Sequence, residues 1–147
     1  MTNSRLAFLA LILASSACGG KRVDPMGLPT EPVAAVRQFM EGVRANDLAV
    51  MGGVWGSSKG PATAWMNSEE LQKRLMVVRS YLSHETYGIE PGGALPGNSS
   101  GERMVRVRLN RRGCAPVVPF TTLQYRGRWL VSAIDLEAAG NPARPCQ

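Results

Sequence analysis

The sequence predicts an α+β domain in which helices come first and an antiparallel sheet follows. From about residue 31 to residue 84, apolar residues recur about every 3.6 residues, which places them on one face of a helix. From about residue 85 onward, apolar and polar residues alternate, as in strands with one buried face. A third observation, an apolar run at the N-terminus, predicts that this domain works outside the cytoplasm.

Residues 1–17 have the features of a signal peptide. Arg5 is the only charged residue before an apolar run from Leu6 to Ala14, and the small residues 15–17 follow that run. A transmembrane helix needs about 20 predominantly apolar residues, and this run ends too early. We therefore expect an exported protein.

The residues after the apolar run resemble the lipobox of bacterial lipoproteins. Ser16 and Ala17 are small and directly precede Cys18. The resemblance implies a lipid on Cys18 that anchors the protein to a membrane of the cell envelope, with residues 18–30 as a flexible tether. Ser15 stands where the lipobox usually has leucine. An ordinary signal-peptidase cut, giving a secreted soluble protein, therefore remains the alternative.

The cysteine count is consistent with a lipid on Cys18. An odd cysteine is awkward in an exported protein, and a lipidated Cys18 leaves Cys114 and Cys146 as a pair. The oxidising compartment permits a disulfide between them, and two buried thiols are the alternative. No Cys-x-x-Cys or His/Cys spacing indicates a zinc site, so we expect no metal and no cofactor.

Three helices are expected, over residues 31–45, 47–55 and 68–84. A proline early in the first helix, an Asn-Asp interruption before the second and Asn67 before the third are typical starting signals. Glu70 lies three residues after Asn67, as in a capping box. Residues 56–63 are expected to form a loop.

Four strands are expected to complete a single domain over residues 31–147. Their predicted ranges are 85–90, 103–110, 117–125 and 129–136. Residues 91–101 (PGGALPGNSSG) and 138–147 are predicted as loop and coil because glycine and proline are frequent there. A strongly twisted sheet wrapped round the helices would bury their apolar faces and leave a conical cavity.

Two segments resemble the nuclear transport factor 2-like superfamily. Residues 32–55 (PVAAVRQFMEGVRANDLAVMGGVW) are similar to its opening helix, its short Asn-Asp-Leu break and its second helix. Residues 120–137 (FTTLQYRGRWLVSAIDLE) are similar to its final hairpin, with glycine in the turn and tryptophan soon after. The resemblance implies a cone-shaped fold, in which the open face of the sheet often forms a homodimer.

Members of this superfamily are either enzymes, such as ketosteroid isomerases and small dehydratases, or non-catalytic binding and assembly domains. The enzymes place an Asp or His base and proton donors inside the cone. In this chain Asp135, Tyr125 and Trp129 would line such a pocket. His84 is the only histidine, and the helix dipole alone favours its expected place at a helix C-terminus. Walker, dinucleotide and Gly-x-Ser-x-Gly signatures are absent, so we expect no catalytic residues.

The most conspicuous polar feature is a cationic stripe in a chain of net charge +6. Five arginines fall within ten residues, and two more flank the turn that follows: Arg103, Arg106, Arg108, Arg111 and Arg112, then Arg126 and Arg128. The patch expected to meet a partner consists of Arg106, Arg108, Arg111 and Arg112. Such a patch usually indicates nucleic acid, which an exported protein seldom meets, so we expect an anionic envelope component or an acidic protein as partner. The alternative is a solvated sheet face. The sequence thus predicts a membrane-anchored envelope lipoprotein that acts as a non-catalytic binding or assembly module; a small-ligand carrier or enzyme using the cone is the alternative.

Overall fold

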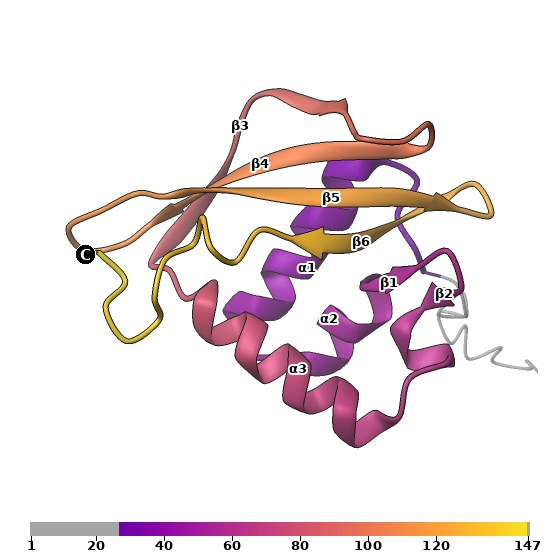
Figure 1. Cartoon of the computed structure of the whole chain (residues 1–147), viewed down its shortest axis with the longest axis horizontal. Helices are drawn as coiled ribbons and strands as arrows, with labels where there is room; N and C mark the ends of the chain where they lie inside the picture. The colour runs from indigo at the N-terminus through magenta and orange to yellow at the C-terminus, as the bar shows by residue number, and fades with distance from the viewer. Residues whose placement is uncertain (1–26, 147) are drawn as a thin grey trace, which may run out of the picture.

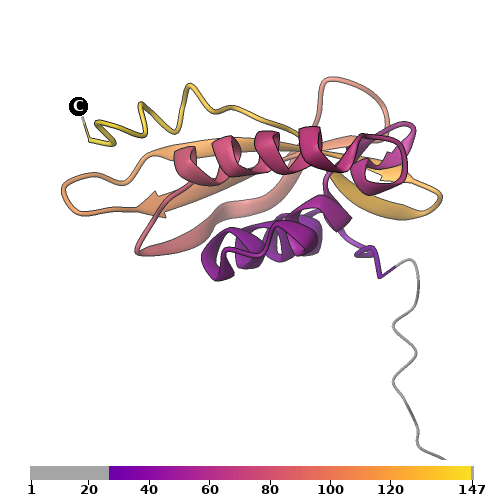
Figure 2. The ribbon, with the colours of Figure 1, turned by 90° about the horizontal axis from the view of Figure 1, so that it is seen from below.

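The computed structural model describes residues 27–146. Within that range the chain forms three α-helices and then a four-stranded antiparallel sheet, which confirms the predicted α+β class. The helices lie on one face of the sheet (Figures 1 and 2). None of the helices in this part of the chain is long and apolar enough to cross a membrane. The predicted signal peptide, Cys18 and most of the tether lie outside the described residues.

The elements follow one another in the predicted order. The helices are α1 (Pro32–Ala45), α2 (Leu48–Val54) and α3 (Ser68–Tyr81). The sheet has the order β3-β4-β5-β6, with β3 (Thr86–Pro96), β4 (Glu102–Asn110), β5 (Val117–Tyr125) and β6 (Arg128–Ile134). A small hairpin, β1 (Gly56–Ser57) and β2 (Gly60–Pro61), and a 3-10 turn (Ala62–Ala64) occupy the predicted loop between α2 and α3.

Side-chain caps start two of the helices. Asp47 accepts hydrogen bonds from the backbone N–H groups of Ala49 and Val50, both at 3.0 Å. Asn67 accepts from the second and third residues of α3, at 2.9 and 3.2 Å. Each cap satisfies N–H groups that have no partner within the helix. The sequence signals therefore predicted these helix starts correctly, although α3 ends at Tyr81, three residues earlier than expected.

The prediction of a loop from residue 91 was wrong. Strand β3 continues through Pro91 to Pro96, and only the residues after it form the loop to β4. Gly92 and Gly93 have φ of 98° and 59°, and the pairing with β4 shifts register between Ile89 and Ala94. Glycine provides this bulge, and proline is tolerated because β3 is an edge strand whose outer N–H groups pair with no neighbour. The bulge and the prolines also protect this edge from pairing with other chains.

Aromatic and aliphatic side chains fill the layer between the helices and the sheet. Phe39 of α1 and Phe120 of β5 meet edge to face, with ring centroids 6.1 Å apart. Met40 and Met51 are completely buried beside them. The inward residues of β4 and β5 are also fully buried, among them Val105, Val107, Leu109 and Val118. Trp65, by contrast, is 43% exposed at the molecular surface.

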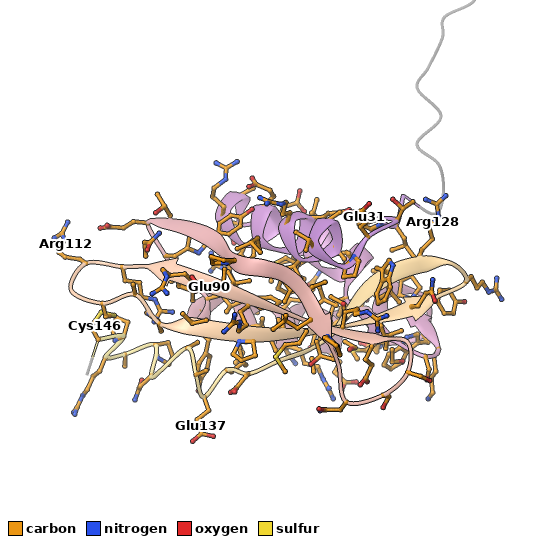
Figure 3. The ribbon with its side chains drawn as sticks, turned by 90° about the horizontal axis from the view of Figure 1, so that it is seen from above. Glu31, Glu90, Arg112, Arg128, Glu137 and Cys146 are labelled. Atoms are coloured by element: carbon orange, nitrogen blue, oxygen red, sulfur yellow. A yellow bond between two sulfur atoms is a disulfide. The ribbon has the colours of Figure 1, made fainter. Side chains whose placement is uncertain are left out.

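The molecule has two distinct ends (Figures 1 and 3). We call one the tether end: it comprises residues 27–30, the β1–β2 hairpin, the β3–β4 loop and the β5–β6 turn. Trp129 N–H donates to Pro29 O at 2.9 Å, which fixes the entering chain beside β6. We call the other the disulfide end: it comprises the C-terminal ends of α1 and α3, the β4–β5 turn and the C-terminal segment.

Candidate functional site

The predicted disulfide closes one end of the molecule. Cys114, in the β4–β5 turn, is bonded to Cys146 with a sulfur–sulfur distance of 2.00 Å, which confirms the predicted pair. The bond joins positions 32 residues apart. It holds the C-terminal segment, which has no strand or helix of its own, against the sheet (Figure 3).

Arg111 fastens the same segment from inside. Its Nε donates to Ser83 O at 2.7 Å, and Nη1 donates to Ala139 O at 2.6 Å and to Pro145 O at 3.3 Å. Nη2 donates to Tyr81 O. Burial lowers the pKa of Arg111. The guanidinium thus joins the end of α3 to the C-terminal segment, so Arg111 is unavailable to the anionic partner expected from the sequence.

Arg108 is also occupied within the protein. Its Nε donates to Glu90 Oε1 at 2.8 Å, and Nη1 donates to Ala115 O at 3.3 Å. The hydrogen bond from Arg108 lowers the pKa of Glu90. The pair lies on the sheet face away from the helices, because Val105, Val107 and Leu109 of the same strand point inward. Glu90 therefore neutralises Arg108, a second member of the predicted patch that is occupied within the protein.

The remaining two cations of the patch, Arg106 and Arg112, lie in different parts of the molecule. Arg106 is exposed on the outer face of β4. Arg112 lies in the turn at the disulfide end, with its side chain 94% exposed and its Nε 3.9 Å from Glu85. The four predicted arginines therefore form no single binding surface: two lie on the sheet face and two at the disulfide end.

The three predicted pocket residues are not brought together. Asp135 is exposed just beyond β6 and accepts a hydrogen bond from the N–H of Ala138 at 3.1 Å, as a turn residue does. Trp129 and Tyr125 lie toward the opposite end of the sheet (Figure 1). Asp135 follows the last residue of β6, whereas Trp129 and Tyr125 lie beside the β5–β6 turn at its start, so the length of the strand keeps them from meeting in one pocket.

A groove at the disulfide end offers a better site. It consists of two adjoining hollows of about 310 and 260 Å³, which share Ser80, Ser83 and His84. We call it the His84 groove. Arg44 and Arg79 border the first hollow, and the second is lined by Glu85, Arg111, Arg112, Pro142 and Pro145. Four guanidinium groups and one carboxylate therefore surround the groove.

His84 lies where the two hollows meet. Its Nδ1 donates to Leu82 O at 2.7 Å, because a carbonyl oxygen can only accept. Its ring packs edge-on against Tyr87, with centroids 5.4 Å apart. Among the described residues, the enclosed Nε2 has no hydrogen-bond partner. Buried polar atoms are rarely left in this state, so such an atom needs an explanation.

Arg79 shows the same incomplete bonding. Its Nε is enclosed without a partner in the described part of the chain, and the residue pairs with no described carboxylate. Its neighbour across the hollow, Arg44, is held by Glu41 at 2.8 Å. A carboxylate or phosphate entering the groove would therefore meet the guanidinium of Arg79, which pairs with no described carboxylate, and the guanidinium of Arg44, which Glu41 orients.

A hydrogen-bonded chain behind the groove positions these groups. Tyr87 Oη donates to Glu41 Oε1 at 3.1 Å, and the same carboxylate accepts from Arg44. The hydrogen bonds from Arg44 and Tyr87 lower the pKa of Glu41. Burial and the hydrogen bond to Glu41 raise the pKa of Tyr87. Glu41 is therefore ionised and Tyr87 neutral at pH 7, which holds Arg44 and the ring beside His84 in place.

Sequence reasoning missed this groove. The helix-end position of His84 was predicted, but its neighbours come from α1, the β4–β5 turn and the C-terminal segment. No local spacing links residues 44, 79 and 112. Within residues 27–146 there is no cluster of three or more His, Cys, Asp or Glu side chains that could hold a metal ion.

Comparisons with protein-family models, curated proteins and solved structures found no match.

Proposed function

We propose that this protein is an exported envelope lipoprotein that binds an acidic group non-catalytically in the His84 groove. The observation that carries the proposal is a hollow lined by Arg44 and Arg79, in which Arg79 pairs with no described carboxylate and Arg44 is oriented by Glu41. The ligand class is a carboxylate or phosphate, presented by an acidic protein or by an anionic envelope component. Nucleic acid is not part of the proposal, because an exported protein seldom meets it.

The N-terminal residues support a location outside the cytoplasm. The apolar run from Leu6 to Ala14 supports export, and the small residues before Cys18 support a lipid at that position. A secreted protein cut by ordinary signal peptidase is the alternative, since Ser15 departs from the lipobox. In either case the His84 groove would face an extracytoplasmic partner.

We assign the domain to the nuclear transport factor 2-like superfamily as part of the same proposal. Helices packed on one face of a sheet and a tight β5–β6 turn with Gly127 at φ 74° agree with that fold. Large side chains such as Phe39, Phe120 and Met51 fill the layer where the enzymes of the family have their pocket. This filling favours the non-catalytic branch over the carrier or enzyme alternative.

The proposal places the binding site at the disulfide end and not on the outer sheet face. A homodimer through the sheet would bring exposed Arg106 of one copy toward the same face of the other. Like charges across an interface cost free energy. A single domain with its groove directed at a different, acidic partner fits the charge distribution better.

The single histidine makes the groove directly observable. In tag-free protein, the Hε1 proton of His84 gives one resonance that can be followed by NMR during titration with inorganic phosphate, acetate or a tetraglutamate peptide. We expect a saturable shift with at least one of these anions. Arg79→Gln should weaken binding about tenfold, the usual effect of losing one charge-assisted hydrogen bond.

Arg126→Gln is the matched control, because it removes the same charge from the tether end. Its affinity for the anion should stay within about twofold of wild type, since charges more than a Debye length apart are largely screened. An unmoved resonance with all three anions would refute the proposal, as would equal losses in the two variants.

A further inference from the structure

The tether end concentrates three cation–π pairs. Lys59 Nζ lies 5.4 Å from the ring centroid of Trp65. Arg126 Cζ lies 5.3 Å from the ring of Tyr125. Arg103 Cζ lies 6.0 Å from the ring of Trp129. Lys59 lies in the β1–β2 hairpin, and Trp65 directly follows the 3-10 turn after it. The other residues come from the start of β4 and from the strand ends at the β5–β6 turn, so the fold brings them to one end.

Direct contacts join most of these residues into one surface. Trp65 Nε1 donates to Gly60 O at 3.1 Å. The ring of Tyr125 packs directly on Gly60: a Cβ atom at residue 60 would lie only 2.9 Å from Tyr125 Cζ. Arg128 pairs with Tyr125 across the β5–β6 turn and lies beside the point where the chain enters (Figure 3). Arg128 and Trp129 contact the entering chain at Leu28 and Pro29, so the surface reaches the attachment point of the tether.

The cations of this surface have no acidic partner. Among the described residues, no carboxylate oxygen lies within 4.0 Å of Lys59, Arg103, Arg126 or Arg128, whereas five cations elsewhere form such pairs. Two acidic residues lie nearby: Glu31 is exposed, and Glu102 accepts a hydrogen bond from Ser99 N–H. Positive charge therefore dominates, next to a tryptophan that is 43% exposed.

We propose that this surface docks onto the anionic headgroups of a lipid bilayer. Tryptophan and tyrosine favour the membrane–water interface, where their rings are apolar and their N–H or O–H stays wet. Lysine and arginine extend their charged groups to the headgroups, and anionic lipids attract each of them. Cations stacked on rings keep their charge free for this contact, which carboxylate partners would cancel.

The tether makes the docked position reachable. Cys18 and Gly27 are nine residues apart, so even a fully extended chain spans at most ~30 Å between them. A lipid on Cys18 therefore keeps this end close to the bilayer; this step rests on the anchor in the proposed function, while the surface itself does not. Docking would direct the His84 groove, at the opposite end, away from the membrane.

Tryptophan quenching tests the docking. The mature protein is weighed by mass spectrometry to establish whether Cys18 carries lipid. It is then mixed with brominated vesicles of phosphatidylcholine alone or of phosphatidylcholine with phosphatidylglycerol. We expect stronger quenching in the anionic vesicles, and Trp65→Phe should remove most of that difference. Lys59→Gln with Arg126→Gln should shift the docking equilibrium by roughly 30-fold, about fivefold for each charge.

The matched control is Arg106→Gln with Arg144→Gln, which removes two exposed charges outside the tether end. Circular dichroism verifies that every variant is folded. Equal quenching in both vesicle types, or equal losses in the two double variants, overturns the docking. Charge-dependent quenching of a chain without lipid on Cys18 supports the docking while removing the anchor. A lipidated chain without charge-dependent quenching overturns the docking alone.

Discussion

The two ends of this domain use the same residue type in opposite ways. At the disulfide end, Arg111 donates to four backbone carbonyls and is part of the fold. At the tether end, Arg103 and Arg126 lie over aromatic rings and pair with no described carboxylate. The difference lies in the number of acceptors: Arg111 reaches carbonyls at the end of α3, which need donors, and carbonyls of the C-terminal segment, whereas Arg103 donates to the single carbonyl of Glu102 among the described residues. Whether an arginine stabilises the fold or meets a partner therefore depends on which backbone groups surround it.

The two cationic regions lie at opposite ends of the molecule, which orients it relative to a membrane. The tether end is proposed to contact anionic lipid, and the His84 groove lies at the disulfide end. A lipoprotein that binds an acidic partner in a membrane-proximal groove would compete with the negative headgroups for its own arginines. Separation of the two cationic regions along the sheet removes this competition.

Removal of the disulfide should have the largest effect on stability. The loop-entropy relation gives about 3–4 kcal/mol for a closed loop of this length. Cys114→Ser with Cys146→Ser should lower the free energy of unfolding by up to that amount, measured by urea denaturation. Reduction of the wild-type protein with dithiothreitol serves as the matched condition and should give the same loss. A loss below about 0.5 kcal/mol would mean that Arg111 alone holds the C-terminal segment.

Replacement of Arg111 should have the next largest effect. Arg111→Ala leaves carbonyls at the end of α3 without their donor, and we expect a loss of about 2–3 kcal/mol in the free energy of unfolding. Arg112→Ala, one residue later and 94% exposed, should change stability by about 0.5 kcal/mol at most. Urea denaturation of the two variants side by side measures the difference. Equal losses would contradict the division between a structural arginine and an exposed one.

The fold could be predicted where local chemistry decides it. The caps at Asp47 and Asn67 and the alternation in β4 depend only on residues close in the sequence, and they were predicted correctly. The continuation of β3 through residues 91–96 was not, because the position of β3 at the sheet edge determines whether proline and glycine are tolerated there. Edge position is a property of the assembled sheet.

The candidate site was less predictable for the same reason. Arg108 and Arg111 look alike in a cationic stripe, yet Glu90 binds one and backbone carbonyls bind the other. The cysteine pair was predictable because parity in an exported chain leaves a single pairing once Cys18 is set aside. The His84 groove depends on side chains from four separate segments, and no spacing in the sequence reports that they meet.

The smallest predicted effect is the pH dependence that Glu41 confers on the disulfide end. Hydrogen bonds from Arg44 and Tyr87 lower its pKa in the folded protein below the ordinary value of 4.5. A carboxyl group with a lowered folded pKa stabilises the fold above its unfolded pKa, and this contribution is lost as the pH falls from about 4.5 through the folded value. Glu41→Gln should therefore flatten the loss of stability between neutral pH and pH 3, measured as the shift in urea midpoint. Tyr87→Phe should flatten it only in part, because the hydrogen bond from Arg44, which lowers the pKa most, remains. If Glu41→Gln loses as much stability between neutral pH and pH 3 as the wild type, the hydrogen bonds that join Glu41 to Arg44 and Tyr87 do not form in solution. Neither result would affect the tether end, whose cations lie over aromatic rings.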